Sequence, residues 1–148
     1  MILPIDEKQF GFWAMRRGGT PNVTIASLLG ISRQAVSQAL HVMDKKIETS
    51  LIEMANANQI SIDTINVERG ILIGRSIPLK TQVIIFVSAK HGIQVWYEHE
   101  GECETCQRYT DCIELIWDYA DELNVTIKKT DEPTKMAEEL FNKVKESV

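Results

Sequence analysis

The sequence predicts an α+β protein, because its hydrophobic pattern changes period near residue 60. Residues 1–59 place apolar side chains three or four positions apart, which is typical of helices. Residues 60–98 alternate apolar with polar positions or carry runs of β-branched residues, which is typical of strands. A helical period returns after residue 112. We therefore expect an N-terminal helix-turn-helix unit, a long linking helix, a small antiparallel sheet and two C-terminal helices.

The first helix is predicted at residues 6–17, and Gly18, Gly19 and Pro21 end it. A helix-turn-helix pattern follows at residues 22–41. A small residue, Ala26, lies in its first helix, and Gly30 fits a turn position with positive φ. Ser32 is a suitable N-cap for the second helix, and Thr24 suits the start of the first. The apolar residues expected to lock the two helices together are Ile25, Leu29, Ile31, Val36 and Ala39.

The second helix of this pattern, about Ser32–Lys45, carries polar side chains suited to contact with DNA. Arg33 could bind a guanine, and Gln34 or Gln38 an adenine, through paired hydrogen bonds in the major groove. A helical hairpin that merely faced solvent would more often expose Glu and Lys. The predicted contacts from the pattern itself are Thr24, Ser32, Arg33, Gln34, Ser37, Gln38 and His41. The predicted phosphate contacts, which position a protein without reading sequence, are Arg16, Arg17, Lys45 and Lys46.

Charge is divided unevenly along the chain. The net charge is −5, but residues 1–46 carry +3 and the remainder carries −8. Attraction to phosphate acts within about a Debye length, roughly 10 Å, so a basic first third can bind DNA while the acidic remainder avoids it. The division favours a protein of two parts.

The long helix is predicted from Ser32 to about Asn58, because this stretch contains neither Gly nor Pro. Its apolar positions are spaced by three or four residues, close to a heptad repeat. They are Val36, Leu40, Met43, Ile47, Leu51 and Met54. This stripe has two interpretations: it packs on the protein's own core, or it forms a two-stranded seam in a homodimer that reads two half-sites.

Four strands are predicted at residues 60–67, 71–77, 81–88 and 93–98, joined by short turns as an antiparallel meander. A helix at residues 81–91 is the alternative for the third, but its β-branched content argues against it. The last two helices are predicted near 112–123 and 133–145. The resulting domains are a DNA-binding unit at 1–46, a linking or dimerisation segment at 47–59, and an α+β sensor or dimerisation domain at 60–148.

Every cysteine of the chain lies in one short segment, with the spacing His-x-x-x-Cys-x-x-Cys-x-x-x-x-x-Cys. These candidate metal ligands are His99, Cys103, Cys106 and Cys112. Three thiolates and an imidazole suit a tetrahedral Zn²⁺ site, which we expect first, as a structural clip or a sensor. An iron–sulfur cluster is the alternative cofactor, and a metal-free thiol switch is the third interpretation.

Other classes of protein lack support in the sequence. No apolar run approaches the ~18 residues that span a bilayer, and the N-terminus has no secretion-signal pattern, so we expect a cytoplasmic protein without membrane contact. A phosphate-binding glycine-rich loop, a Gly-x-Ser-x-Gly elbow and a His-Glu-x-x-His pair are all missing. We therefore do not expect an enzyme. The alternatives are a metal-dependent or redox enzyme, or a protein-binding adaptor, that contains a helical hairpin.

The run from Thr24 to Ser37, TIASLLGISRQAVS, resembles the DNA-binding unit of many prokaryotic regulators. The whole layout is similar to small archaeal helix-turn-helix regulators of the Tfx-like kind, with an added C-terminal cysteine cluster. The segment Gly92–Gly101, followed by the three cysteines, also resembles an element of archaeal proteins of this type. The resemblance implies a transcription regulator that binds double-stranded DNA in a sequence-specific way.

Overall fold

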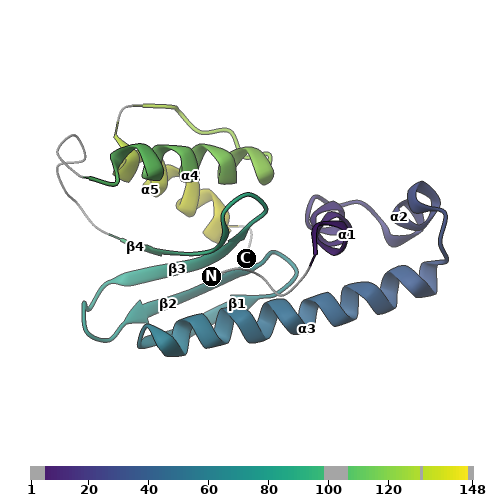
Figure 1. The fold of residues 1–148 in the computed structure, drawn as a ribbon. Helices are drawn as coiled ribbons and strands as arrows, with labels where there is room; N and C mark the ends of the chain where they lie inside the picture. The colour runs from purple at the N-terminus through teal and green to yellow at the C-terminus, as the bar shows by residue number, and fades with distance from the viewer. Residues whose placement is uncertain (1–5, 99–106, 131, 147–148) are drawn as a thin grey trace.

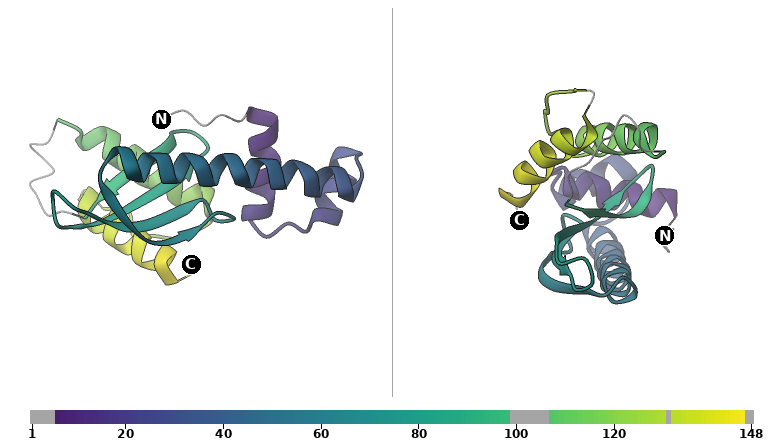
Figure 2. Two further views of the ribbon diagram at one scale, coloured as in Figure 1. Left: turned by 90° about the horizontal axis from the view of Figure 1, so that it is seen from below. Right: turned by 90° about the vertical axis from the view of Figure 1, so that its left-hand side faces the viewer.

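The computed structural model describes residues 6–98, 107–130 and 132–146. Figure 1 shows a four-stranded sheet with one long helix on one face and two helices on the other. Two short helices lie beyond the end of the sheet, beside the first half of the long helix (Figure 2). The elements are α1 (Glu7–Arg17), α2 (Asn22–Leu29), α3 (Arg33–Ala57), β1 (Ile60–Asn66), β2 (Ile71–Ser76), β3 (Gln82–Ser88), β4 (Gly92–Tyr97), α4 (Tyr109–Glu122) and α5 (Pro133–Glu146). The predicted α+β class is confirmed.

The sheet is the predicted antiparallel meander, in the order β1-β2-β3-β4. The segment 82–88 is a strand, not a helix, and both of its faces are buried. Because successive strand residues point to opposite faces, Val83, Ile85 and Val87 pack toward α3. Ile84 and Phe86 pack instead toward α4 and α5. This burial on both sides explains why the segment is apolar throughout.

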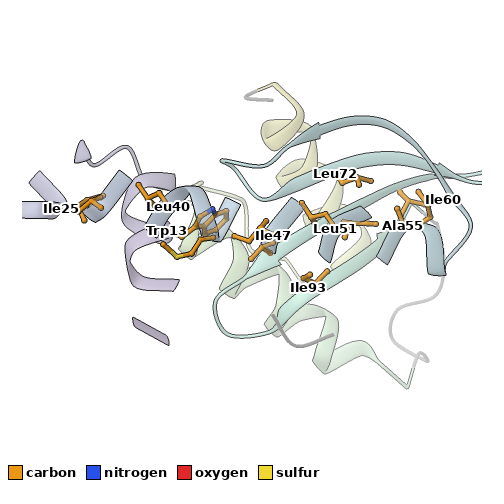
Figure 3. Close-up of a cluster of buried hydrophobic side chains, with 14 of the residues drawn as sticks. Trp13, Ile25, Leu40, Ile47, Leu51, Ala55, Ile60, Leu72 and Ile93 are labelled. Carbon is orange, nitrogen blue, oxygen red and sulfur yellow. The ribbon is translucent and has the colours of Figure 1, made fainter. Parts of the chain in front are cut away.

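The apolar stripe of α3 belongs to the protein's own core. Val36, Met43, Ile47 and Leu51 are fully buried, and Leu40 is 2% exposed. Figure 3 shows this cluster running from Ile25 near the end of the molecule to the side chains beneath the sheet. The dimer-seam interpretation of this stripe is therefore corrected: apart from the half-buried Met54, its side chains are enclosed by the sheet, α1 and α2 and are not available to a second helix.

The turn between β1 and β2 contacts α1 closely. Gly70 has a φ of +69°, and a Cβ built there would lie 2.5 Å from the Trp13 ring. The fully buried Trp13 fills this space, so the turn needs a residue without a side chain. One hydrophobic cluster thus runs from the short helices into the sheet.

The second core lies between the sheet and the two C-terminal helices. The rings of Phe86 and Tyr119 stack with centroids 4.1 Å apart, and Phe141 packs 5.5 Å from Phe86. Met136 and Leu140 of α5 are buried in the same cluster. None of the described helices is both long enough and apolar enough to cross a membrane.

Candidate nucleic-acid interface

The connection between α2 and α3 has the local geometry that the sequence predicts. Gly30 follows α2 in the left-handed conformation, with φ 66° and ψ 32°, and its N–H donates to the carbonyl of Ala26. Ser32 is the N-cap of α3, and its hydroxyl accepts a hydrogen bond of 3.1 Å from the N–H of Ala35. A left-handed glycine and a serine cap together end one helix and start the next at a sharp angle.

Part of the predicted apolar lock holds these helices together. Ile25 and Val36 are fully buried, and Ala26 is 5% exposed, which allows α2 and α3 to approach closely. Leu29 and Ile31 differ from the prediction, because they are 36% and 39% exposed. They flank Gly30 at the end of the molecule, where no described element lies over them.

The polar side chains of α3 gather on the side opposite its buried stripe. Gln34, Gln38, His41 and Lys45 are all exposed and lie three or four residues apart, so they form one row, here called the contact row. The remaining predicted positions from the pattern, which are also exposed, are Thr24, Ser32, Arg33 and Ser37. All of them lie on α2 or on the half of α3 that is farther from the sheet (Figure 1).

The contact row has two neighbours that the sequence analysis did not select. Val42, 48% exposed, lies one turn after Gln38. Ala35, also exposed, lies one turn before Gln38. Small apolar side chains of this kind can contact the methyl group of thymine. The helical spacing could have predicted that both residues are exposed, because they fall outside the apolar stripe of α3. Asn22 at the start of α2 contacts one of the other predicted positions, with its amide nitrogen 3.4 Å from the Ser37 hydroxyl.

Arg16 holds α1 against α3. Its guanidinium donates to both carboxylate oxygens of Asp44, at 2.8 and 2.5 Å, and only 17% of its side chain is exposed. This pair neutralises the one acidic residue in the first half of α3, so Lys45 and Arg33 dominate the charge there. Arg16 was predicted to contact phosphate; in this structure its charge is directed to Asp44.

Arg17 lies in the interior, which corrects its predicted role as a phosphate contact. Its side chain is 3% exposed and donates a 2.7 Å hydrogen bond to the carbonyl of Val87. The guanidinium lies 4.8 Å from the centre of the Trp13 ring and 3.5 Å from a carboxylate oxygen of Glu122. Burial lowers the pKa of Arg17 below its ordinary value, against the opposing effect of Glu122.

The candidate metal ligands are placed only in part. His99, Cys103 and Cys106 lie outside the described residues. Cys112 is half-buried in α4, where its N–H donates to the carbonyl of Arg108 at 2.9 Å. Within residues 6–98, 107–130 and 132–146, no three His, Cys, Asp or Glu side chains are grouped as a metal site.

The fold is thus a helix-turn-helix unit joined by its long second helix to a sheet covered by two helices. Comparison with known proteins gives no match to a family model, to a curated protein or to a solved structure.

Proposed function

We propose that this protein is a transcription regulator that binds double-stranded DNA sequence-specifically, with α3 residues from Ser32 to Lys45 in the major groove. The observation that carries the proposal is the contact row, which is exposed along one side of α3 while the other side is buried. A helix of ~10–12 Å diameter fits a major groove ~12 Å wide. The resemblance of residues 24–37 to prokaryotic DNA-binding units supports the same proposal.

The side chains of this surface divide into two roles. Arg33, Gln34 and Gln38 have the paired donor and acceptor groups that distinguish guanine and adenine at their edges. Lys45 carries a charge without directional pairing, so it suits phosphate contact. Acidic residues on α3 begin with Glu48 beyond the Arg16–Asp44 pair, nearer the sheet. Positive charge is therefore concentrated in the half of α3 that would meet DNA.

The remaining predictions complete this proposal. We propose a cytoplasmic regulator without catalytic activity, with Zn²⁺ held by His99, Cys103, Cys106 and Cys112; an iron–sulfur cluster is the alternative cofactor. A homodimer on two half-sites also remains a prediction. The buried stripe of α3 is not its seam, so a dimer would use another surface.

The test starts by selecting a binding site from a random duplex pool with the full-length protein and then measuring affinity by gel shift. We expect Arg33→Ala and Gln34→Ala to weaken binding of the selected site, each by roughly 5- to 150-fold. Arg75→Ala and Gln107→Ala make the same chemical changes at exposed positions in the sheet and before α4, and should leave affinity unchanged. Equal affinity of all four variants would refute the proposal, as would failure to select any site.

A further inference from the structure

We propose that the cavity between α5 and the adjoining ends of β3 and β4 binds an aromatic organic cation. The cavity has a volume of about 600 Å³. This is within the ~300–1,000 Å³ typical of sites for small organic molecules. Its apolar surface comes from Ile84, Trp96 and Phe141, and its carboxylates come from Glu98, Glu132 and Glu138.

The apolar lining of the cavity comes from two aromatic rings and one aliphatic side chain. Trp96 of β4 and Phe141 of α5 have ring centroids 5.8 Å apart, with an angle of 43° between their planes. Ile84, 4% exposed, is the cross-strand partner of Trp96. Phe141 is also 4% exposed, whereas Trp96 is only half-buried. The apolar lining is therefore anchored in the second core, and Trp96 is the more exposed of its two aromatic side chains.

The packing of α5 explains why this space stays open. Met136, Leu140 and Val144 direct the apolar side of the helix into the core shared with α4. The next side of the same helix, with Glu138 and Asn142, overlies the ends of the strands and lines the cavity. These two lining residues are polar, so this side of α5 adds no apolar packing against the strand ends.

The charge around the cavity favours a cationic ligand. Three carboxylates line it, against the two ammonium groups of Lys135 and Lys145. Lys135 lies 2.9 Å from Glu132, and Lys145 donates to the side-chain oxygen of Gln82. Glu98 and Glu138 form no salt bridge with any described residue. An anionic ligand would meet these two carboxylates, whereas a cation would be attracted by them and could pack beside the Trp96 side chain, which lines the same cavity.

No three of the described acidic, His or Cys side chains are grouped closely enough for a metal ion. The described carboxylates of the lining thus form no metal site, and together with the aromatic side chains they suit a molecule that carries both a ring system and a delocalised positive charge.

A structural connection links this cavity to the helix-turn-helix unit. β3 (Gln82–Ser88) begins at the cavity with Gln82 and Ile84, and near its other end the carbonyl of Val87 accepts the hydrogen bond from Arg17 of α1. A regulatory use of the ligand rests on the proposed DNA-binding function. Ligand binding itself does not, so it is measured without DNA.

The experiment compares rhodamine 123, a xanthene cation, with fluorescein, a xanthene anion of similar size, by fluorescence anisotropy with the full-length protein. We expect micromolar binding of rhodamine 123, at least about tenfold tighter than that of fluorescein. Equal binding of the two dyes, preference for fluorescein, or no binding of rhodamine 123 would each overturn the proposal. Binding of rhodamine 123 by a protein that selects no DNA site in the absence of the dye would instead overturn only the DNA-binding function.

Two variants locate the binding site. Glu138→Gln removes one carboxylate at the cavity and should weaken rhodamine 123 binding about threefold to tenfold. Glu114→Gln makes the same change at an exposed position of α4 outside the lining and should have no effect. Asn142→Trp places a ring in the cavity from an exposed helix position and should abolish binding without altering the core. Unchanged binding in both Glu138→Gln and Asn142→Trp would place the dye elsewhere and refute this site.

Discussion

The guanidinium of Arg17 in α1 lies 3.5 Å from the carboxylate of Glu122 in α4, although 105 positions separate them in the chain. Glu122 also accepts hydrogen bonds from the hydroxyl of Ser88, at 2.7 Å, and from the N–H of Ala89. The pair therefore joins three elements at the end of β3: the first helix, the strand and the far helical layer. The N-terminal and C-terminal helices are thus joined by a partly buried ion pair, in addition to the hydrophobic packing of both on the sheet.

Arg17→Ala should destabilise the fold by roughly 2–4 kcal/mol, because it leaves Glu122 partly buried without its cation and opens space beside Trp13. Urea unfolding followed by circular dichroism measures this free energy. Arg16→Ala is the matched control: its pair with Asp44 is less buried, so its loss should cost less than the loss of Arg17. Similar losses in the two variants would contradict the difference in burial on which this prediction depends.

Gly70→Ala should destabilise the protein by roughly 2–4 kcal/mol, because the new methyl group would meet the Trp13 ring and the residue would keep a positive φ. A substitution at Gly19 separates the effect of the positive φ from the effect of contact with Trp13. It also has a positive φ, of +96°, but nothing lies within 4 Å of a Cβ built there. Gly19→Ala should therefore cost only about 1 kcal/mol in thermal or urea unfolding. If it costs as much as Gly70→Ala, contact with Trp13 is not the reason for glycine in the β1–β2 turn.

Tyr119→Phe should leave stability at neutral pH unchanged or raise it by about 1 kcal/mol. The hydroxyl of Tyr119 is buried and has no hydrogen-bond partner among the described residues, so its removal relieves a desolvation cost. Burial also raises the pKa of Tyr119 above its ordinary value of 10.0. The stability linked to this group is thus present below pH 10.0 and is lost as the pH rises through the folded-state pKa.

Urea unfolding of the wild-type protein and of Tyr119→Phe, at about pH 7 and about pH 11, measures both the effect of the hydroxyl at neutral pH and the loss of stability at high pH. The wild-type protein should lose more stability between these values than Tyr119→Phe does. A hydroxyl that stabilises the fold would give the opposite result at neutral pH, with Tyr119→Phe less stable by more than about 1 kcal/mol.

Most of the fold could be predicted from the sequence because its elements are defined by local periods. The strands and helices followed from alternation, helical spacing and turn residues, and Gly30 and Ser32 marked the turn of the helix-turn-helix unit. The stripe of α3 was ambiguous for a physical reason. An apolar row shows that a helix buries one side, but not whether its own sheet or a second chain covers it.

Less of the candidate site could be predicted, because it depends on partners that are distant in sequence. Arg16 and Arg17 are adjacent and chemically identical, yet one is partly buried in a pair with Asp44 and the other is almost fully buried against Val87 and Glu122. No local signal distinguishes them. The cavity at Trp96 and Phe141 was also missed, since it forms only where α5 meets the strand ends.

Metal analysis tests the predicted cysteine cluster directly. Protein purified without chelator should contain one Zn²⁺ per chain, and Cys112→Ser should lower that content, because a three-ligand site binds Zn²⁺ more weakly. Ser61→Ala, which alters an exposed polar side chain of β1 outside the predicted ligand set, should keep the metal. A brown anaerobic preparation that absorbs near about 400 nm would show an iron–sulfur cluster instead of zinc.

The salt dependence of DNA binding should separate Lys45 from Arg16 and Arg17. Each phosphate contact contributes about 0.9 to the slope of log affinity against log salt concentration, so Lys45→Ala should reduce the slope by about that amount. Arg16 is held by Asp44, and 3% of the Arg17 side chain is exposed, so their alanine variants should keep the wild-type slope. The slopes come from gel-shift titrations at several salt concentrations, restricted to variants whose circular dichroism matches the wild type. An unchanged slope in Lys45→Ala, with a reduced one in Arg16→Ala, would show that the Arg16–Asp44 pair opens on DNA and that phosphate contact is made by α1.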